Sequence, residues 1–255
     1  MPLYLRCVVC RQLNSEELVA TRSSPNHSLF EPLAVLNLRD HIEEKLRAAI
    51  LRGIFKPGDH LVETTIAEQL GVSRAPVREA LSALERAGLV VCIPRRGYFG
   101  IDFTEKDIDE IYSLRLLLEL GALRRAVERI TEEDLDELQH LVDRLGKSAQ
   151  RMEAPEETVE LDLSFHGLIC KLADHARLLS YWDNLRAQAQ LLVGVTTKTH
   201  YNHPEEPGRL HQEILDAIRE RDLPRAEQLL IAHMMDAQRR ALAALRSLHA
   251  AEEAE

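Results

Sequence analysis

Two short helical patterns separated by a glycine turn constrain this chain more than any other feature of its sequence. Residues 63–70 form one amphipathic stretch closed by Gly71, and residues 74–87 form a second that ends at Gly88. Glycine is favoured just after a helix because it adopts the left-handed conformation there. Two helices joined by a three- or four-residue turn with glycine predict a helix-turn-helix. The second helix is expected to bury one stripe, formed by Val77, Ala80, Leu81 and Leu84.

The flanking segments complete this unit. An apolar period over residues 38–50 predicts a preceding helix that ends before Lys-Pro-Gly at 56–58. Residues 89–93 and 97–101 are apolar, β-prone runs on either side of Pro-Arg-Arg, which is the pattern of a hairpin. A helix-turn-helix followed by a hairpin with a basic tip is a winged helix, and we predict one over residues 33–101.

Beyond residue 101 the periodicity is helical throughout. Thr104 with Asp107 and Thr131 with Asp134 have the spacing of capping boxes, so a helix should begin just after each threonine. Four more helices are expected at about 155–173, 176–197, 206–220 and 223–248. We therefore predict a mainly α protein, in which a winged helix-turn-helix precedes an antiparallel bundle of about six helices over residues 102–250.

The N-terminal segment shows no such order. Residues 1–32 lack sustained periodicity and are predicted to form a flexible extension. They contain neither the cationic region nor the long apolar core of a secretory signal, and no run in the chain reaches the roughly 18 apolar residues of a membrane span. We expect a cytoplasmic protein with no membrane partner. Four cysteines are too few for a disulfide framework, and the Cys7-x-x-Cys10 pair is interpreted as chance because no further ligands accompany it.

Charge is distributed unevenly along the chain. The formal net charge of -10 argues, taken alone, against binding nucleic acid. However, residues 101–255 hold 31 of the 42 acidic residues, so the predicted winged helix is weakly basic. The overall charge therefore excludes DNA binding only if the chain is treated as a single domain.

Arginines gather where a winged helix meets DNA. Arg74 and Arg78 lie four residues apart at the start of the predicted second helix, the end that enters a major groove. Arginine can bind guanine with two hydrogen bonds or clamp phosphates, and Ser73 at the helix N-cap can present its hydroxyl and N–H to a phosphate. Arg95 and Arg96 at the wing tip can reach the minor groove or the backbone. The alternative is a solvated helix surface, but four arginines at a turn and a wing favour DNA contact.

A family resemblance supports this interpretation. Residues 58–90, followed by Pro-Arg-Arg-Gly, closely resemble the winged-helix domain of GntR-family transcriptional regulators, with the sequence GDHLVETTIAEQLGVSRAPVREALSALERAGLV. In that family two arginines four residues apart touch operator DNA, and they match Arg74 and Arg78. The resemblance also implies DNA contacts for Ser73 and for Gly97 in the wing. Base preference does not carry over, because Thr64 and the pair Ala75-Pro76 depart from other members.

A second set of residues has the chemistry of a metal site. Asp162 and His166 are spaced to share one helical face. His211 and His233 lie on the apolar sides of two later helices and so should point into the bundle. One carboxylate and three imidazoles suit a divalent metal with open coordination positions, with Zn or Ni preferred over Mn or Fe. Any one of these histidines alone would more often be a hydrogen-bonded core residue, but the set favours a site.

Residues 104–245 resemble the all-helical FCD ligand-binding domain of FadR-like GntR regulators. Metal-binding members have Asp and His four residues apart, a His about 45 to 50 residues later and a last His about 22 beyond, and the four candidate ligands here match that spacing. Leu114-Arg-Leu-Leu-Leu-Glu119 also resembles a segment whose arginine commonly faces the effector pocket, which implies effector binding by Arg115. A plain ion pair between Arg115 and Glu119 is an equally good interpretation.

The sequence thus predicts a homodimeric regulator that binds double-stranded operator DNA. We expect a repressor, modulated by a small carboxylate bound at a metal site in the C-terminal domain. One alternative is a metal-responsive regulator, in which the ion itself is the signal. A metal-dependent enzyme built on the bundle is a second alternative, disfavoured because the chain has no H-E-x-x-H motif and no nucleophile elbow.

Overall fold

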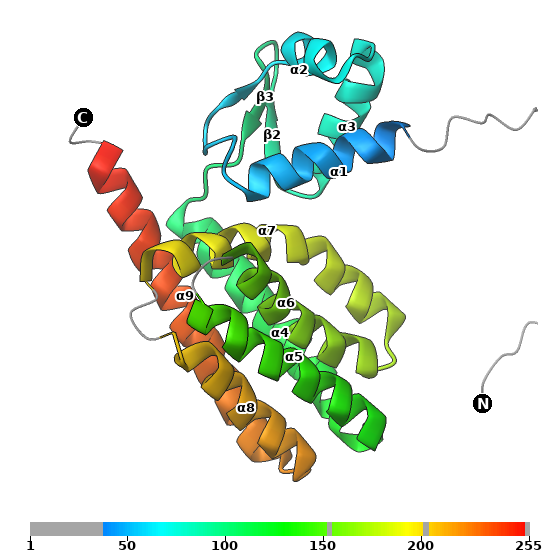
Figure 1. The fold of residues 1–255 in the computed structure, drawn as a ribbon, viewed down its shortest axis with the longest axis vertical. Helices are drawn as coiled ribbons and strands as arrows, with labels where there is room; N and C mark the ends of the chain where they lie inside the picture. Colours follow the sequence, from blue (N-terminus) through cyan, green and yellow to red (C-terminus); the bar gives the residue numbers. More distant parts are fainter. Residues whose placement is uncertain (1–37, 152–154, 201–203, 253–255) are drawn as a thin grey trace, which may run out of the picture. The chain divides into compact units, whose positions relative to one another are not determined.

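A computed structural model describes residues 38–151, 155–200 and 204–252 (Figure 1). Within these ranges three helices and three strands are followed by six further helices. This confirms the predicted fold class, a mainly α protein with a winged helix-turn-helix and a helical bundle. No helix in the described ranges is both long enough and apolar enough to cross a membrane. The predicted extension over residues 1–32, with its two cysteines, lies outside the described residues.

The winged helix contains a three-stranded antiparallel sheet in the order β1-β3-β2. The hairpin was predicted, but β1 was not, because a strand of two residues leaves no periodicity in the sequence. It pairs with β3 and places His60 opposite Phe99. The elements of this unit are α1 (Leu38–Leu51), β1 (His60–Leu61), α2 (Glu63–Leu70), α3 (Arg74–Arg86), β2 (Val90–Ile93) and β3 (Gly97–Gly100).

The core of the winged helix fixes the orientation of α3. Gly71 has a φ of 66°, a left-handed conformation that ends α2 and opens the turn to α3. The predicted stripe of α3 is fully buried, and it lies in one core with three residues of α1: Ile42, Leu46 and Ile50. Because this face is buried, the opposite face of α3 is left exposed with Arg74 and Arg78 on it.

The bundle consists of α4 (Glu105–Arg129), α5 (Glu132–Arg151), α6 (Pro155–Leu172), α7 (Ala176–His200), α8 (Glu206–Arg219) and α9 (Leu223–Glu252). Both predicted capping boxes form. Thr104 Oγ1 accepts a hydrogen bond from the Asp107 N–H at 3.2 Å, while the Asp107 carboxylate accepts one from the Thr104 N–H at 2.8 Å. Thr131 and Asp134 make the same reciprocal pair. Helix α4 lies against α6, α7 and α9, and α8 lies against α5 and α9.

Glycines let two pairs of helices in the bundle approach closely. A Cβ on Gly167 of α6 would lie 2.8 Å from the ring of Trp182, so α7 packs its indole directly against the α6 backbone. A Cβ on Gly208 of α8 would lie 2.9 Å from the Cα of Gly146 in α5. These contacts fix α6 and α8 at the turns that carry His166 and His211.

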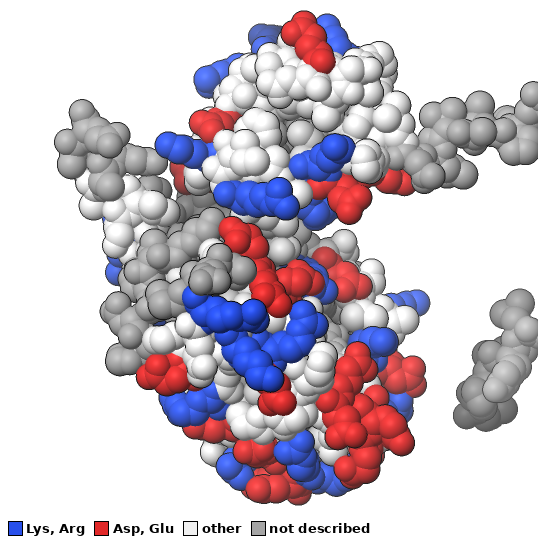
Figure 2. All heavy atoms as spheres, viewed as in Figure 1, with Lys and Arg blue, Asp and Glu red and all other residues white. Residues whose placement is uncertain are grey.

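Charged side chains of both signs are mixed over the face of the bundle drawn in Figure 2. Acidic side chains gather at the end where α5 begins, whose first turn contains Glu132, Glu133 and Asp134. Acids in a first helical turn interact favourably with the helix dipole. The acidity of the second half of the chain therefore belongs largely to solvated helix surfaces.

Candidate metal centre, pocket and DNA-binding surface

The four predicted metal ligands meet inside the bundle. Helix α6 contributes Asp162 and His166, α8 contributes His211 and α9 contributes His233. One ligand atom from each residue lies within 4.8 Å of the others. All three imidazoles are buried, and the Asp162 side chain is 14% exposed. Three helices far apart in sequence thus bring together one carboxylate and three imidazoles, a set that can hold a divalent metal ion.

His211 shows why this cluster suits a cation. Its Nδ1 lies 2.7 Å from the carbonyl oxygen of Pro207, which can only accept, so Nδ1 carries the proton. The other nitrogen, Nε2, is buried without a hydrogen-bond partner and lies 3.3 Å from Asp162 Oδ1. In a neutral ring this Nε2 is an acceptor that faces a second acceptor. Either a second proton or a metal ion between the two atoms relieves this arrangement.

His166 is held by a buried carboxylate on α4. Its Nδ1 lies 2.7 Å from Glu119 Oε2, and its Nε2 lies 3.2 Å from His233 Nε2. Glu119 Oε1 accepts hydrogen bonds from Arg115 Nε at 3.1 Å and from Trp182 Nε1 at 3.0 Å. Burial opposes the charge of Glu119, but His166 and Arg115 outweigh it and lower its pKa to about 2. A carboxylate behind a ligating histidine orients the ring and raises its basicity.

The protonation states of two other candidate ligands also suit metal binding. Burial raises the pKa of Asp162, but the His211 imidazole 3.3 Å away and the charges of His166 and His233 lower it more, so the net pKa lies well below the ordinary value. Burial, together with the charges of His211 and His166, holds the pKa of His233 well below its usual range. An ionised carboxylate and a neutral imidazole are the forms that coordinate metals.

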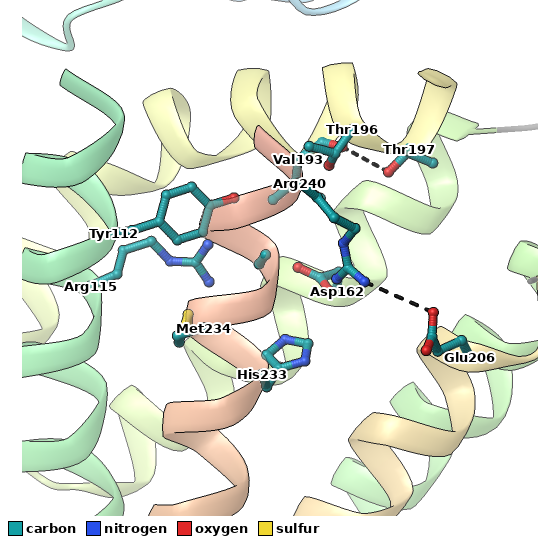
Figure 3. Close-up of a pocket in the computed structure, with 11 residues that line it drawn as sticks. Tyr112, Arg115, Asp162, Val193, Thr196, Thr197, Glu206, His233, Met234 and Arg240 are labelled. Carbon is teal, nitrogen blue, oxygen red and sulfur yellow. Dashed lines mark hydrogen bonds and ion pairs between the residues drawn. The ribbon is translucent and has the colours of Figure 1, made fainter. Parts of the chain in front are cut away.

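A pocket adjoins the cluster on the side of Asp162 and His233 (Figure 3). The guanidinium of Arg115 and the ring of Tyr112 project into this space from α4. Arg115 is 2% exposed, yet its Nη2 is buried without a hydrogen-bond partner. Burial raises the pKa of Tyr112 to about 12, so its hydroxyl keeps its proton. The remaining wall includes Thr196 and Arg240.

The ion pair between Arg115 and Glu119 is present in the structure, and effector binding by Arg115 stays a prediction. Nε forms the ion pair with Glu119, and that contact uses only one of the five N–H donors of the guanidinium. Nη2 remains unpaired beside the pocket. A buried donor without a partner is costly, so an acceptor bound beside this atom would be stabilised.

The predicted DNA contacts on α3 lie on one exposed surface. Ser73 caps α3 with an extended backbone, and its hydroxyl makes no capping hydrogen bond, so it remains available to a ligand. The side chains of Arg74 and Arg78 are 59% and 60% exposed. The two arginines are not independent cations. Both form ion pairs with the same carboxylate, that of Glu63 at the start of α2.

The wing tip places the other predicted contacts in a tight turn. The Arg96 N–H donates to the Ile93 carbonyl at 2.9 Å. Arg95 has a φ of 66° and Gly97 a φ of 97°, both left-handed conformations. Arg95 therefore occupies a conformation that non-glycine residues seldom adopt, and its exposed side chain stands at the tip. The guanidinium of Arg96 lies over the ring of Phe99, 5.3 Å from its centroid.

Sequence reasoning missed several residues of both sites. Glu63 left no signal, because its partners lie 11 and 15 residues later. The role of Glu119 behind His166 was not predicted either. Two pocket residues could have been found from their spacing in the sequence. Tyr112 lies one turn before Arg115, and Arg240 lies two turns after His233, each on the same helical face.

A winged helix with exposed arginines, followed by a helical domain with a pocket beside a metal-ligand cluster, defines a DNA-binding transcription regulator with an effector-binding domain. Residues 38–99 match the bacterial regulatory proteins of the gntR family, and residues 110–236 match the FCD domain. The chain belongs to the GntR family, in its FadR-like branch with a C-terminal FCD domain. This is a family of transcription regulators and not of enzymes, as predicted.

Relatives of known role are similar over most of their length. The gluconate operon transcriptional repressor of Bacillus subtilis is 31% identical over 182 residues, which cover 70% of this chain and 74% of the relative. The HTH-type transcriptional repressor RspR of Escherichia coli is 28% identical over 191 residues, 75% of this chain and 83% of the relative. Among solved structures, Escherichia coli McbR/YncC superposes with a TM-score of 0.67 at 25% identity, covering 84% of this chain and 99% of that one.

Proposed function

We propose that this protein is a cytoplasmic homodimeric repressor that leaves its operator when a small organic acid binds at the metal in its FCD domain. The observation that carries the effector part is the buried, unpaired Nη2 of Arg115 beside Asp162 and His233. Two similar proteins are named repressors, which supports repression. We keep residues 33–101 as the DNA-binding domain and residues 102–250 as the effector domain.

The proposed DNA contacts are Ser73, Arg74 and Arg78 on the recognition helix and Arg95, Arg96 and Gly97 on the wing. Their support is geometric: the arginines of both sets are exposed, and the free hydroxyl of Ser73 stands at a helix N-terminus, where phosphate binds well. Two copies of the recognition helix would read half-sites about one DNA turn apart or a multiple of it. A homodimer is therefore part of the proposal.

The proposed metal ligands are Asp162, His166, His211 and His233. The ion, which we expect to be Zn or Ni rather than Mn or Fe, would supply a positive centre with open positions for carboxylate oxygens. The protein would orient the ligands and supply hydrogen-bond donors to the acid. Glu119 orients His166, while Arg115 and the Tyr112 hydroxyl offer donors to the free end of the acid.

A carboxylate fits this pocket better than a neutral ligand does. Two guanidinium groups, Arg115 and Arg240, border it. Arg240 is paired with Asp236 and with Glu206, which also lines the pocket, whereas Arg115 has an unused donor. Paired N–H donors of a guanidinium match the two oxygens of a carboxylate. A 2-hydroxy acid adds a hydroxyl oxygen that can share the metal. The proposed effector class is therefore a small carboxylic or 2-hydroxy acid.

The test is binding to the gene's own upstream region, measured by fluorescence anisotropy against unrelated DNA of equal length over a range of salt. We expect preferential binding that weakens as salt rises, because phosphate contacts release counterions. Adding gluconate or other small 2-hydroxy acids should release the metal-loaded protein. Equal affinity for both DNAs would refute the proposal. Release by metal alone, with no effect of any acid, would favour the metal-responsive alternative.

Replacing Arg115 with lysine is predicted to raise the acid concentration needed for release by about tenfold to a hundredfold. Lysine keeps the charge but loses the planar fork that binds a carboxylate with two hydrogen bonds. Operator affinity without acid should be unchanged. The control is Arg124→Lys, on the same helix but exposed and paired with Glu227. An unchanged acid response in Arg115→Lys would remove Arg115 from the effector site.

A further inference from the structure

Glu63 joins the two proposed DNA-reading arginines into one unit. It is the first residue of α2, and its side chain is only 16% exposed although both its partners are largely in solvent. Its Oε2 lies 2.8 Å from Arg78 Nη2 and 3.3 Å from Arg74 Nη2. Arg78 Nε also donates to Oε1 at 3.0 Å. The hydrogen bond from Arg78 lowers the pKa of Glu63, so its charge persists at neutral pH.

We propose that Glu63 is a positioning residue for DNA recognition, which holds Arg78 and Arg74 in the orientation that distinguishes operator from other DNA. The inference rests on the proposed DNA-binding role of these arginines. It assigns Glu63 no direct contact with a base. Its main effect would be on discrimination between DNA sequences.

The pattern of hydrogen bonds to Arg78 supports this role. A guanidinium presents a side edge, made by Nε and one Nη, and an end fork, made by its two Nη atoms. Glu63 occupies the side edge of Arg78 through Nε and Nη2. Nη1 of the end fork makes no contact with Glu63, and the Arg78 side chain is 60% exposed. A guanine offers O6 and N7 to such a fork, so Arg78 is preset for a bidentate contact.

Glu63 lies in the first turn of α2, where an acid interacts favourably with the helix dipole, but it also lies beside the proposed DNA contacts. A carboxylate on a DNA-facing surface is repelled by phosphates and should weaken binding to any DNA. Removing its charge alone should therefore strengthen non-specific binding. A long arginine that is not held must also lose side-chain freedom when it meets a base, which weakens the specific contact. Glu63 thus lowers affinity for all DNA while favouring the correct sequence.

Three variants of the full chain separate these effects. Glu63→Gln removes the charge and weakens the contacts with Arg74 and Arg78. Glu63→Asp keeps the charge but shortens the side chain by one methylene. Glu68→Gln is the matched control: Glu68 is exposed on the same helix, and its carboxylate has no hydrogen bond or ion pair among the described contacts. Affinities for the upstream fragment and for unrelated DNA would be measured by anisotropy, with unfolding curves to confirm that each variant is folded.

We expect both glutamine variants to bind unrelated DNA roughly twofold more tightly. The ratio of operator to non-operator affinity should fall about tenfold in Glu63→Gln and in Glu63→Asp, and stay at the wild-type value in Glu68→Gln. A wild-type ratio retained in both Glu63 variants would overturn the inference. So would tighter operator binding in Glu63→Gln with an undiminished ratio, because Glu63 would then compete with DNA for the arginines. A wild-type protein that shows no discrimination would instead count against the proposed function.

Discussion

Replacing His211 with alanine is expected to reduce metal affinity by about a hundredfold to a thousandfold. Four-ligand structural zinc sites hold the ion with about 10–16 kcal/mol, so one ligand accounts for roughly a quarter of that free energy. The loss should be large because His211 supplies the unpaired Nε2 opposite Asp162. The amount of bound metal per chain would be measured after dialysis by inductively coupled plasma mass spectrometry. Metal affinity would be measured by competition with a chromophoric chelator.

His140→Ala is the matched control for this experiment, since His140 is an exposed histidine on α5 away from the cluster. It should leave metal content at the wild-type level. The far-UV circular dichroism spectra of the metal-free variants should match that of the metal-free wild type. Such a match would show that a loss of bound metal is not caused by unfolding. Full metal content in His211→Ala would remove His211 from the ligand set.

Replacing Arg78 with alanine is expected to weaken operator binding by about tenfold to a hundredfold and binding to unrelated DNA by much less. A bidentate arginine–guanine contact discriminates by about 1–3 kcal/mol, whereas loss of one phosphate contact affects all sequences alike. Anisotropy titrations of the upstream fragment and of unrelated DNA would measure both affinities.

Arg86→Ala provides the comparison on the same helix. Arg86 is exposed in the last turn of α3 and donates to Ser82 Oγ at 3.0 Å, on the opposite end from the proposed DNA contacts. Its loss removes the same charge with little effect on discrimination. If Arg78→Ala and Arg86→Ala weakened operator and unrelated DNA equally, Arg78 would act only as a general positive charge.

Most of the fold could be predicted because its signals are local. The turn at Gly71, the buried stripe of α3 and the two capping boxes each depend on residues a few positions apart. The bundle helices show the same dependence, since α8 was expected at 206–220 and spans Glu206–Arg219. Strand β1 escaped prediction because its two residues are defined only by their pairing with β3, almost forty residues later.

The meeting of the four candidate metal ligands was predictable for a different reason. Each lies on an apolar helical face, and such faces must meet in a bundle, so their convergence follows from the periodicity. What the periodicity did not reveal is how the surrounding charges pair. The clamp on Arg78 by Glu63 and the contact of Glu119 with His166 both depend on the exact approach of separate helices, and no spacing in the sequence encodes that approach.

The packing of Trp182 against Gly167 gives the protein a built-in optical probe. Trp182 is the chain's single tryptophan, so all indole emission originates at this one point. The indole N–H donates to the same Glu119 carboxylate that touches His166 and Arg115. Glu119 thus connects the candidate metal cluster and the pocket to the only indole. Binding of a metal or of an acid there can be followed by intrinsic fluorescence without attaching a dye.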